Sequence, residues 1–176
     1  MGEPQNNSTY VCSCCGKEHT GVPFSFAADF PDPYANLNKD GRDARAIIGS
    51  DQCIIDQQQF YLRGCLEIPI VGTDQVFLWG LWATLWEHDF DEIAEYWDSE
   101  GRQTRIGPYK ARLANTLSLY PETFNLTLSI RIMPVGERPL FVVDDLDHPL
   151  GTEQRNGISL DKAQEYACLL LRMAGR

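Results

Sequence analysis

The sequence has no segment long and apolar enough to cross a bilayer. Its longest mainly apolar run, residues 76–86, has 11 residues, whereas a membrane-spanning helix needs about 20. Residues 1–8 are polar and lack the apolar core of a signal peptide. We therefore expect a cytoplasmic protein without membrane contact. Its six cysteines should then be thiols or metal ligands rather than a disulfide framework.

The sequence is also poor in basic residues. Lys and Arg number 15 against 25 Asp and Glu, giving a formal net charge of -10 and a pI of about 4.7. Binding to nucleic acid depends on neutralising phosphates, and anionic membranes attract basic segments. The charge balance argues against both partners. An acidic surface attracts basic surfaces, so a basic protein is the partner that the composition favours.

Motifs of the common catalytic sites are missing as well. There is no glycine-rich phosphate loop and no serine in a nucleophile elbow. Carboxylates cluster at 87–92, where the positive end of a helix dipole would stabilise them, so a structural role explains them. The acidic run 144–147 before His148 lacks the spacing of a calcium loop and is typical of a solvated turn. The sequence therefore favours a protein that is not an enzyme.

Hydrophobic residues are abundant enough for a packed core, at 43% of the chain. A length of 176 residues fits one domain. Residues 1–9 predict a flexible tail, and residues 10–176 predict a single α+β domain. Within it, residues 21–43 are rich in Pro, Asp and Asn and predict an irregular loop.

Apolar patterns predict strands in the middle of the chain, at 52–56, 60–70, 75–86, 124–133 and 140–144. Residues 75–86 are apolar on both faces, which is typical of a central strand covered on both sides. Residues 124–133 alternate between apolar and polar, which predicts one core face and one wet face. Residues 109–117 show no clear period.

Helices are predicted before, within and after this strand cluster. The first is a short helix at 42–48, the second begins at an Asp89 cap, and the third runs from a Ser159 cap to Gly175. Because the strands cluster and short turns join them, alternating βαβ units are disfavoured. The predicted fold is α+β, with a central, mostly antiparallel sheet, packed helices and an N-terminal CxxC turn.

The sharpest local motif is Cys12-x-x-Cys15-Gly16, with His19 close behind. Two cysteines at this spacing can bind one zinc ion, and the glycine lets the backbone fold tightly around the sulfur atoms. No second pair follows, so a complete site would need Cys53 together with His19 or Cys65. Reduced, partly buried thiols are the alternative. A redox pair is disfavoured, because Gly16 and the turn after it oppose a helix start.

A second candidate site lies around Arg63 and Glu67, which share one face of a predicted strand. A buried pair would be unusual, whereas an exposed pair is ordinary. Trp79, Trp82 and Trp86 could line a ligand cleft beside them, although their spacing is also typical of a strand in a core. An enzyme or small-ligand-binding protein with its site near this aromatic strand is therefore the alternative function.

Several stretches in order resemble a known family. They are YVCSCCGKEHTGVPFSF at 10–26, DQCIIDQQQFYLRGCLEIPI at 51–70, WGLWATL at 79–85, YPET at 120–123, ERPLF at 137–141 and HPLGTEQRNGIS at 148–159. Over nearly its full length the chain resembles the uncharacterised bacterial proteins called domain of unknown function 2199 (DUF2199). The resemblance implies a single-domain bacterial cytosolic protein and brings no activity with it.

Within this resemblance some positions look like family signature: Cys12, Cys15, His19, Cys53, Arg63, Gly64, Glu67, Pro69 and His148. Cys14 and Cys65 look incidental. The resemblance thus favours Cys12, Cys15, His19 and Cys53 as the ligands of a structural zinc ion. The leading hypothesis is a non-enzymatic binding module, in which zinc pins the N-terminal turn to the sheet and a basic protein is the partner.

Overall fold

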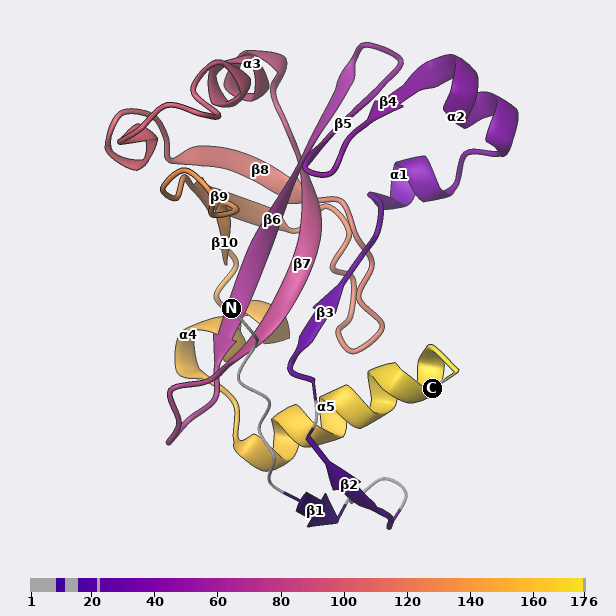
Figure 1. The fold of residues 1–176 in the computed structure, drawn as a ribbon, viewed down its shortest axis with the longest axis vertical. Coiled ribbons are helices and arrows are strands. Elements are labelled where there is room, and N and C mark those ends of the chain that lie inside the picture. The colour runs from indigo at the N-terminus through magenta and orange to yellow at the C-terminus, as the bar shows by residue number, and fades with distance from the viewer. Residues whose placement is uncertain (1–8, 12–15, 22, 176) are drawn as a thin grey trace.

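The computed structural model describes residues 9–11, 16–21 and 23–175 (Figure 1). These residues form one large sheet of eight strands, a separate two-stranded hairpin and five α-helices. The α+β class is therefore confirmed. None of the helices in the described ranges has the length and apolar character needed to span a bilayer.

Part of the large sheet closes into a barrel of five strands. They are β6 (Gln59–Pro69), β7 (Val76–Leu85), β8 (Tyr109–Leu113), β9 (Thr127–Arg131) and β10 (Leu140–Val143). Each strand pairs antiparallel with the next. The first and fifth strands of such a series point the same way, so the barrel closes with a parallel pairing, at Leu140 and Cys65. The mostly antiparallel order was predicted, but the closure was not.

The barrel core is built from the inward-facing side chains of these strands. The inner face of β6 carries Leu62, Gly64 and Leu66, and all three are buried. Gly64 is required there, because an added Cβ would lie 2.3 Å from the Phe141 ring and 2.8 Å from the carbonyl oxygen of Pro139. The absence of a side chain thus lets β10 approach β6 closely enough to close the barrel.

Strand β7 is the central strand, as its two apolar faces predict. One of its edges pairs with β6 along its whole length. The other edge is shared by β8 and by the parallel strand β3 (Ser25–Ala27). The inner face of β7 lies in the barrel core, and its outer face contributes the fully buried Trp82 to a second, smaller core.

This second core lies where β6 extends beyond the barrel. There β6 pairs with β5 (Gln52–Ile55), and β5 pairs with the edge strand β4 (Ala46–Ile48). Two short helices precede them, α1 (Asp32–Ala35) and α2 (Lys39–Arg45). The predicted helix at 42–48 therefore ends early, because its last residues pair with β5 rather than continuing the helix.

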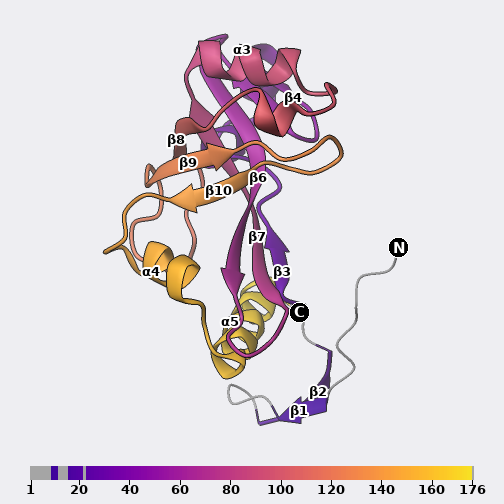
Figure 2. The same ribbon diagram turned by 90° about the vertical axis from the view of Figure 1, so that its left-hand side faces the viewer.

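The remaining helices lie at the two ends of the molecule (Figures 1 and 2). Helix α3 (Glu87–Glu95) and the β4–β5 hairpin lie at one end, which we call the apical end. Helices α4 (Pro149–Asn156) and α5 (Leu160–Met173) lie toward the other end. Ser159 caps α5 as predicted, since its side chain accepts a hydrogen bond from the Lys162 N–H.

Candidate functional site

Helix α3 and the five residues after it give the apical end many carboxylates. Residues 87–100 contain seven carboxylates, at 87, 89, 91, 92, 95, 98 and 100, and no Lys or Arg. The helix buries Phe90 and Ile93 against the barrel and turns Asp91 and Glu95 to solvent. The predicted Asp89 cap is wrong: the helix begins two residues earlier, Trp86 occupies the N-cap, and Asp89 lies in the first turn.

Two large apolar side chains are exposed at the same end. Trp86, directly before α3, is 73% exposed, and Ile47 on the edge strand β4 is 72% exposed. Ile47 pairs with Ile54, Ile54 with Phe60, and Phe60 with Leu85. Directly paired residues point to the same face of a sheet, so this row carries the apolar surface from beneath α3 out to the edge of the sheet.

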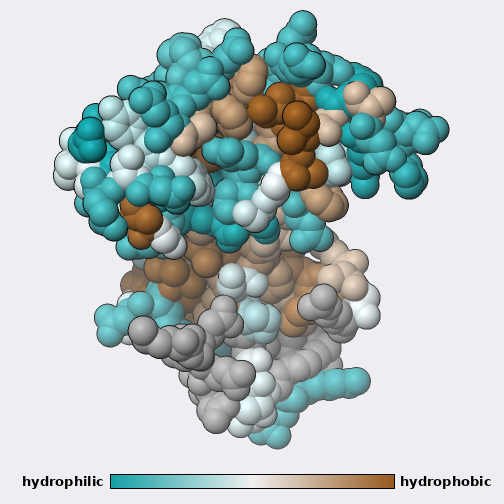
Figure 3. Space-filling view, turned by 45° about the horizontal axis from the view of Figure 1, so that its top comes forward, coloured by the Kyte–Doolittle hydropathy of each residue, from teal (hydrophilic) through white to brown (hydrophobic). Residues whose placement is uncertain are grey.

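We call Trp86, Asp91, Glu95, Ile47 and Ile54 together the apical face. Figure 3 turns this end toward the viewer and shows hydrophobic atoms gathered between hydrophilic ones. An exposed apolar surface rimmed by charge is typical of a site that binds another macromolecule. The charged side chains that α3 contributes to the rim are carboxylates, His88 apart, and two residues before Ile47 the exposed Arg45 is paired with Asp56.

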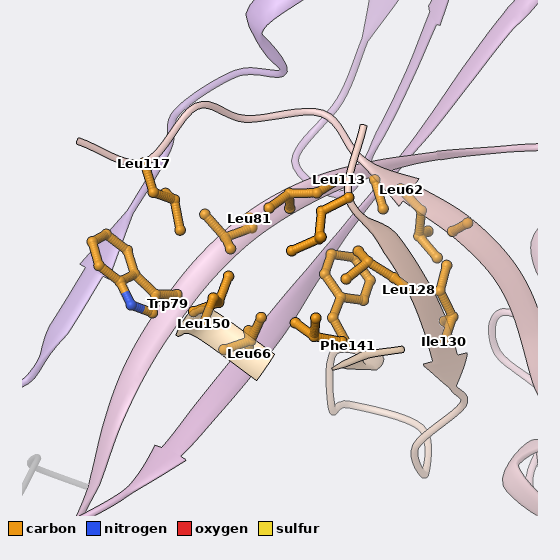
Figure 4. Packing of buried hydrophobic residues seen from close by; sticks show 14 of the residues in the cluster. Leu62, Leu66, Trp79, Leu81, Leu113, Leu117, Leu128, Ile130, Phe141 and Leu150 are labelled. Atoms are coloured by element: carbon orange, nitrogen blue, oxygen red, sulfur yellow. The ribbon is translucent and has the colours of Figure 1, made fainter. Parts of the chain in front are cut away.

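The three tryptophans do not line a common cleft. Trp79 points into the barrel and is 4% exposed, Trp82 lies in the second core, and Trp86 is at the apical end. Figure 4 shows Trp79 beside Leu117 and Leu150 at one end of the barrel core. Its indole N–H is buried, and none of the described residues offers it an acceptor. The strand spacing alone could not separate these environments, because a closed barrel gives β7 two different buried faces.

Arg63 and Glu67 lie on one face of β6, as their spacing predicts, and no ion pair joins them in the described part of the chain. Glu67 is exposed, whereas Arg63 is half-buried. The Arg63 guanidinium lies 5.8 Å from the centre of the Trp82 ring. It donates from Nη2 to the carbonyl oxygen of Ala28 at 3.4 Å, a long hydrogen bond.

The predicted zinc ligands are only partly visible. Cys12 and Cys15 lie outside the described residues, as does the CxxC turn itself. The backbone of His19 is in β2 (Glu18–Thr20), which pairs with β1 (Thr9–Val11). Cys53 is in β5. Figures 1 and 2 place β2 and β5 at opposite ends of the molecule, so the structure does not bring Cys53 to His19.

Cys53 lies in an apolar environment. It is completely buried in the second core, beside Tyr61 and Trp82. Burial raises the pKa of its thiol to about 11. Among the described residues, no group of three or more His, Cys, Asp or Glu side chains is arranged to hold a metal ion. The zinc quartet therefore stays a prediction.

A polar network that sequence reasoning missed joins α4, α5 and the loop after β8. Glu153 accepts hydrogen bonds from Tyr120 Oη at 2.6 Å and Tyr166 Oη at 2.9 Å, and its Oε1 lies 2.5 Å from Lys162 Nζ. Burial first, and then Glu153, raise the pKa of Tyr120 far above its usual range. Both carboxylate oxygens are occupied, so the network is suited to holding elements together. No signal in the sequence pointed to it, because helix α4 was not predicted.

His148 also has a structural role. Its Nδ1 accepts a hydrogen bond from the Leu150 N–H at 3.1 Å and so caps α4. Its Nε2 lies 2.7 Å from the carbonyl oxygen of Pro121. With Nδ1 as acceptor and Nε2–H as donor, a neutral imidazole satisfies both contacts. The acidic turn before it is solvated, since Asp145 and Asp147 are exposed.

Comparison with known proteins adds the family. The model of one family, described as uncharacterised proteins conserved in bacteria (DUF2199), matches residues 11–158. No curated protein and no solved structure matches the chain significantly. The matched range includes all five strands of the barrel, helices α1 to α4 and the β4–β5 hairpin, and it ends just before α5. The chain therefore belongs to the DUF2199 family.

Proposed function

We propose that this protein is a non-enzymatic binding module that holds a basic protein segment on its apical face. The observation that carries the proposal is the exposure of Trp86 at the start of a helix whose charged side chains, His88 apart, are all carboxylates. Exposed tryptophan is a frequent anchor of protein interfaces. The carboxylates of α3 would steer a basic partner toward it.

The edge of the sheet supports the same proposal. Ile47 lies on β4, which pairs with β5 alone among the described strands, and its side chain is exposed. A partner that carries Lys or Arg beside apolar residues would meet both parts of the apical face, the carboxylates and the apolar row. The fully occupied networks around Glu153 and His148 offer no free catalytic group, which also favours binding over catalysis.

The test uses a synthetic amphipathic peptide rich in Lys and Leu as the probe and measures its affinity by fluorescence anisotropy. We expect Trp86→Ala to weaken binding more than tenfold, as for a buried interface anchor. We expect the double variant Asp91→Asn, Glu95→Gln to weaken it about fivefold, since an exposed charge contact contributes roughly 0.5 kcal/mol.

Helix α5 supplies the matched control. Asp161→Asn, Glu165→Gln removes the same two charges at the same four-residue spacing from exposed positions, in a helix away from the apical end. We expect this double variant to bind the peptide as the native protein does. An equal loss in both double variants would mean that net charge alone attracts the peptide, and the apical face would then not be the site.

We propose in addition that Cys12 and Cys15 bind a structural zinc ion. The motif lies between β1 and β2, and Gly16 has a φ of 68°, in the region that glycine adopts readily. The measurement is the zinc content of the purified native protein and of Cys12→Ser and Cys53→Ser. Loss in both variants would support the quartet with Cys53. Loss in Cys12→Ser alone would exclude Cys53, and a metal-free native protein would end the proposal.

A further inference from the structure

The guanidinium of Arg63 leaves most of its hydrogen-bond donors without an acceptor in the described part of the chain. Its Nε–H is buried, and no acceptor among these residues reaches it. Apart from the long hydrogen bond to Ala28, no acceptor contacts its terminal nitrogens in the described residues. A half-buried cation that no carboxylate hydrogen-bonds among the described residues is unfavourable, because burial weakens its hydration.

The carboxylate of Asp51, whose charge interacts with that of Arg63, is already hydrogen-bonded to other side chains. Asp51 accepts hydrogen bonds from Arg138 Nε at 2.6 Å and Ser50 Oγ at 2.7 Å. Its own carbonyl oxygen accepts the Arg63 N–H at 2.8 Å, which fixes its backbone beside β6. Burial works to raise the pKa of Asp51, but its hydrogen bonds from Arg138 and Ser50 and the nearby charges of Arg138 and Arg63 lower it overall. Asp51 therefore stays ionised and bound to Arg138.

A second guanidinium with free donors lies near Cys65, because its charge acts on that thiol. Arg138 uses only Nε for Asp51, and its terminal nitrogens have no acceptor among the described residues. It immediately precedes Pro139, whose carbonyl oxygen accepts the Cys65 N–H at 2.8 Å. Cys65 is paired with Gly80 across β7, and Gly80 with Ala27 on β3. The charges of Arg63 and Arg138 thus both act on Cys65, which lies in a row of small side chains.

We propose that Arg63 and Arg138 bind a small oxyanion, a carboxylate or phosphate group, above Cys65 on the outer face of β6. A guanidinium presents paired N–H donors that match the two oxygens of such a group. The Trp82 ring holds the Arg63 guanidinium in place before the ligand arrives. Because the positive charge is delocalised, an anion at the terminal nitrogens also offsets the charge of the buried part of the guanidinium. This site is independent of the apical face.

Glu67 limits what the site can hold. It is exposed, shares this face of β6, and lies two residues from Cys65, whose thiol pKa it works to raise. Both arginines work to lower the same pKa, although burial dominates and raises it overall. The negative charge of Glu67 disfavours a ligand that carries two negative charges of its own. The site therefore binds a singly charged carboxylate better than a doubly charged phosphate.

The test is isothermal titration of the native protein with acetate and, separately, with inorganic phosphate at fixed ionic strength. We expect saturable binding with one site per chain, tighter for acetate. Arg63→Gln and Arg138→Gln should each weaken the affinity at least tenfold. Arg131→Gln removes an exposed arginine from β9 and should leave the affinity unchanged. Tighter binding of phosphate would identify a phosphate site instead of a carboxylate site.

A second measurement covers the case in which Arg63→Gln fails to fold. The native protein is treated with iodoacetamide, and alkylation of Cys65 is followed by peptide mass spectrometry. We expect the bound anion to slow alkylation of Cys65 at least threefold and to leave alkylation of Cys168 unchanged. Absence of saturable binding by either anion, or equal affinity in Arg63→Gln, would overturn the proposal, and so would an unprotected Cys65 in the folded protein.

Discussion

At the scale of single residues, Gly64 determines how the barrel closes. It lies on the inner face of β6, where the Phe141 ring and the carbonyl oxygen of Pro139 occupy the space that a side chain would take. Close-packed interiors tolerate added atoms poorly, because neighbouring side chains must leave their preferred rotamers. A single methyl group at Gly64 would therefore separate β6 from β10.

We predict that Gly64→Ala lowers the free energy of unfolding by about 3 kcal/mol, the upper end of ordinary overpacking. The measurement is urea unfolding followed by circular dichroism. The matched control is Gly49→Ala, where the nearest atom to an added Cβ is 3.9 Å away; we expect a change within about 0.5 kcal/mol. A well-tolerated Gly64→Ala would mean that β10 can move outward without loss.

Residue patterns in the sequence predicted some environments and not others. Alternation along β6 placed Arg63 and Glu67 on one face correctly, since the period of a strand is fixed by local geometry. The burial of Trp79 and Trp82 and the exposure of Trp86 depend on what packs against each side of β7. That packing comes from segments far away in the chain, so the local pattern could not separate the three.

At the scale of elements, one side chain fastens the segment after α3 to the β9–β10 connection. Arg102 lies in the 3-10 helix η1 (Arg102–Thr104) and is 2% exposed. It donates to the carbonyl oxygens of Met133 at 2.8 Å, Pro134 at 3.1 Å and Glu137 at 2.8 Å, and also to that of Trp97. Its planar guanidinium thus donates hydrogen bonds to four carbonyl oxygens in two separate segments of the chain.

We predict that Arg102→Lys lowers the free energy of unfolding by about 3 kcal/mol. A lysine ammonium cannot reach these carbonyl oxygens in the same geometry, and buried acceptors left without donors cost roughly 1–3 kcal/mol each. Arg105→Lys is the control, because Arg105 is exposed and its guanidinium lies over the ring of Tyr96 without a hydrogen bond to any carbonyl oxygen of the described residues. The comparison uses thermal unfolding, and similar melting temperatures for the two variants would contradict the prediction.

Element boundaries show where local signals end. The strand predicted at 124–133 begins only at Thr127. Glu122 and Asn125 before it have φ values of 40° and 67°, a left-handed backbone that interrupts a strand. Helix α4 was missed because its cap is a histidine rather than Ser, Thr, Asp or Asn. The parallel seam of the barrel was missed because no local period encodes it.

At the scale of the whole molecule, buried phenols make the fold sensitive to alkali. Burial raises the pKa of Tyr61 to about 12, and it also raises the pKa of Tyr109, Tyr120 and Tyr166, with Glu92 or Glu153 adding to the effect. A group whose pKa is higher in the folded state stabilises the fold below its unfolded value of 10.0. That contribution is lost as the pH rises toward the folded value.

We therefore predict that the free energy of unfolding is nearly constant from about pH 7 to 9 and falls steeply above about pH 10. Cys53 begins the fall, since its thiol pKa rises from 9.0 to about 11 in the folded state. The measurement is urea unfolding at a series of pH values. In Tyr120→Phe the fall should be shallower, because one ionising group is gone. A parallel curve for this variant would show that Tyr120 does not contribute.

The parallel seam between β6 and β10 also has a consequence for the order of assembly. The other four seams of the barrel join strands that follow one another along the chain, so each can form soon after its second strand leaves the ribosome. The fifth joins Cys65 to Leu140, and closing so long a loop carries an added entropic cost. During synthesis the edge of β6 that pairs with β10 therefore stays unpaired until Leu140 has been made. A chain stalled before Leu140 exposes this strand edge, and aggregation can begin there.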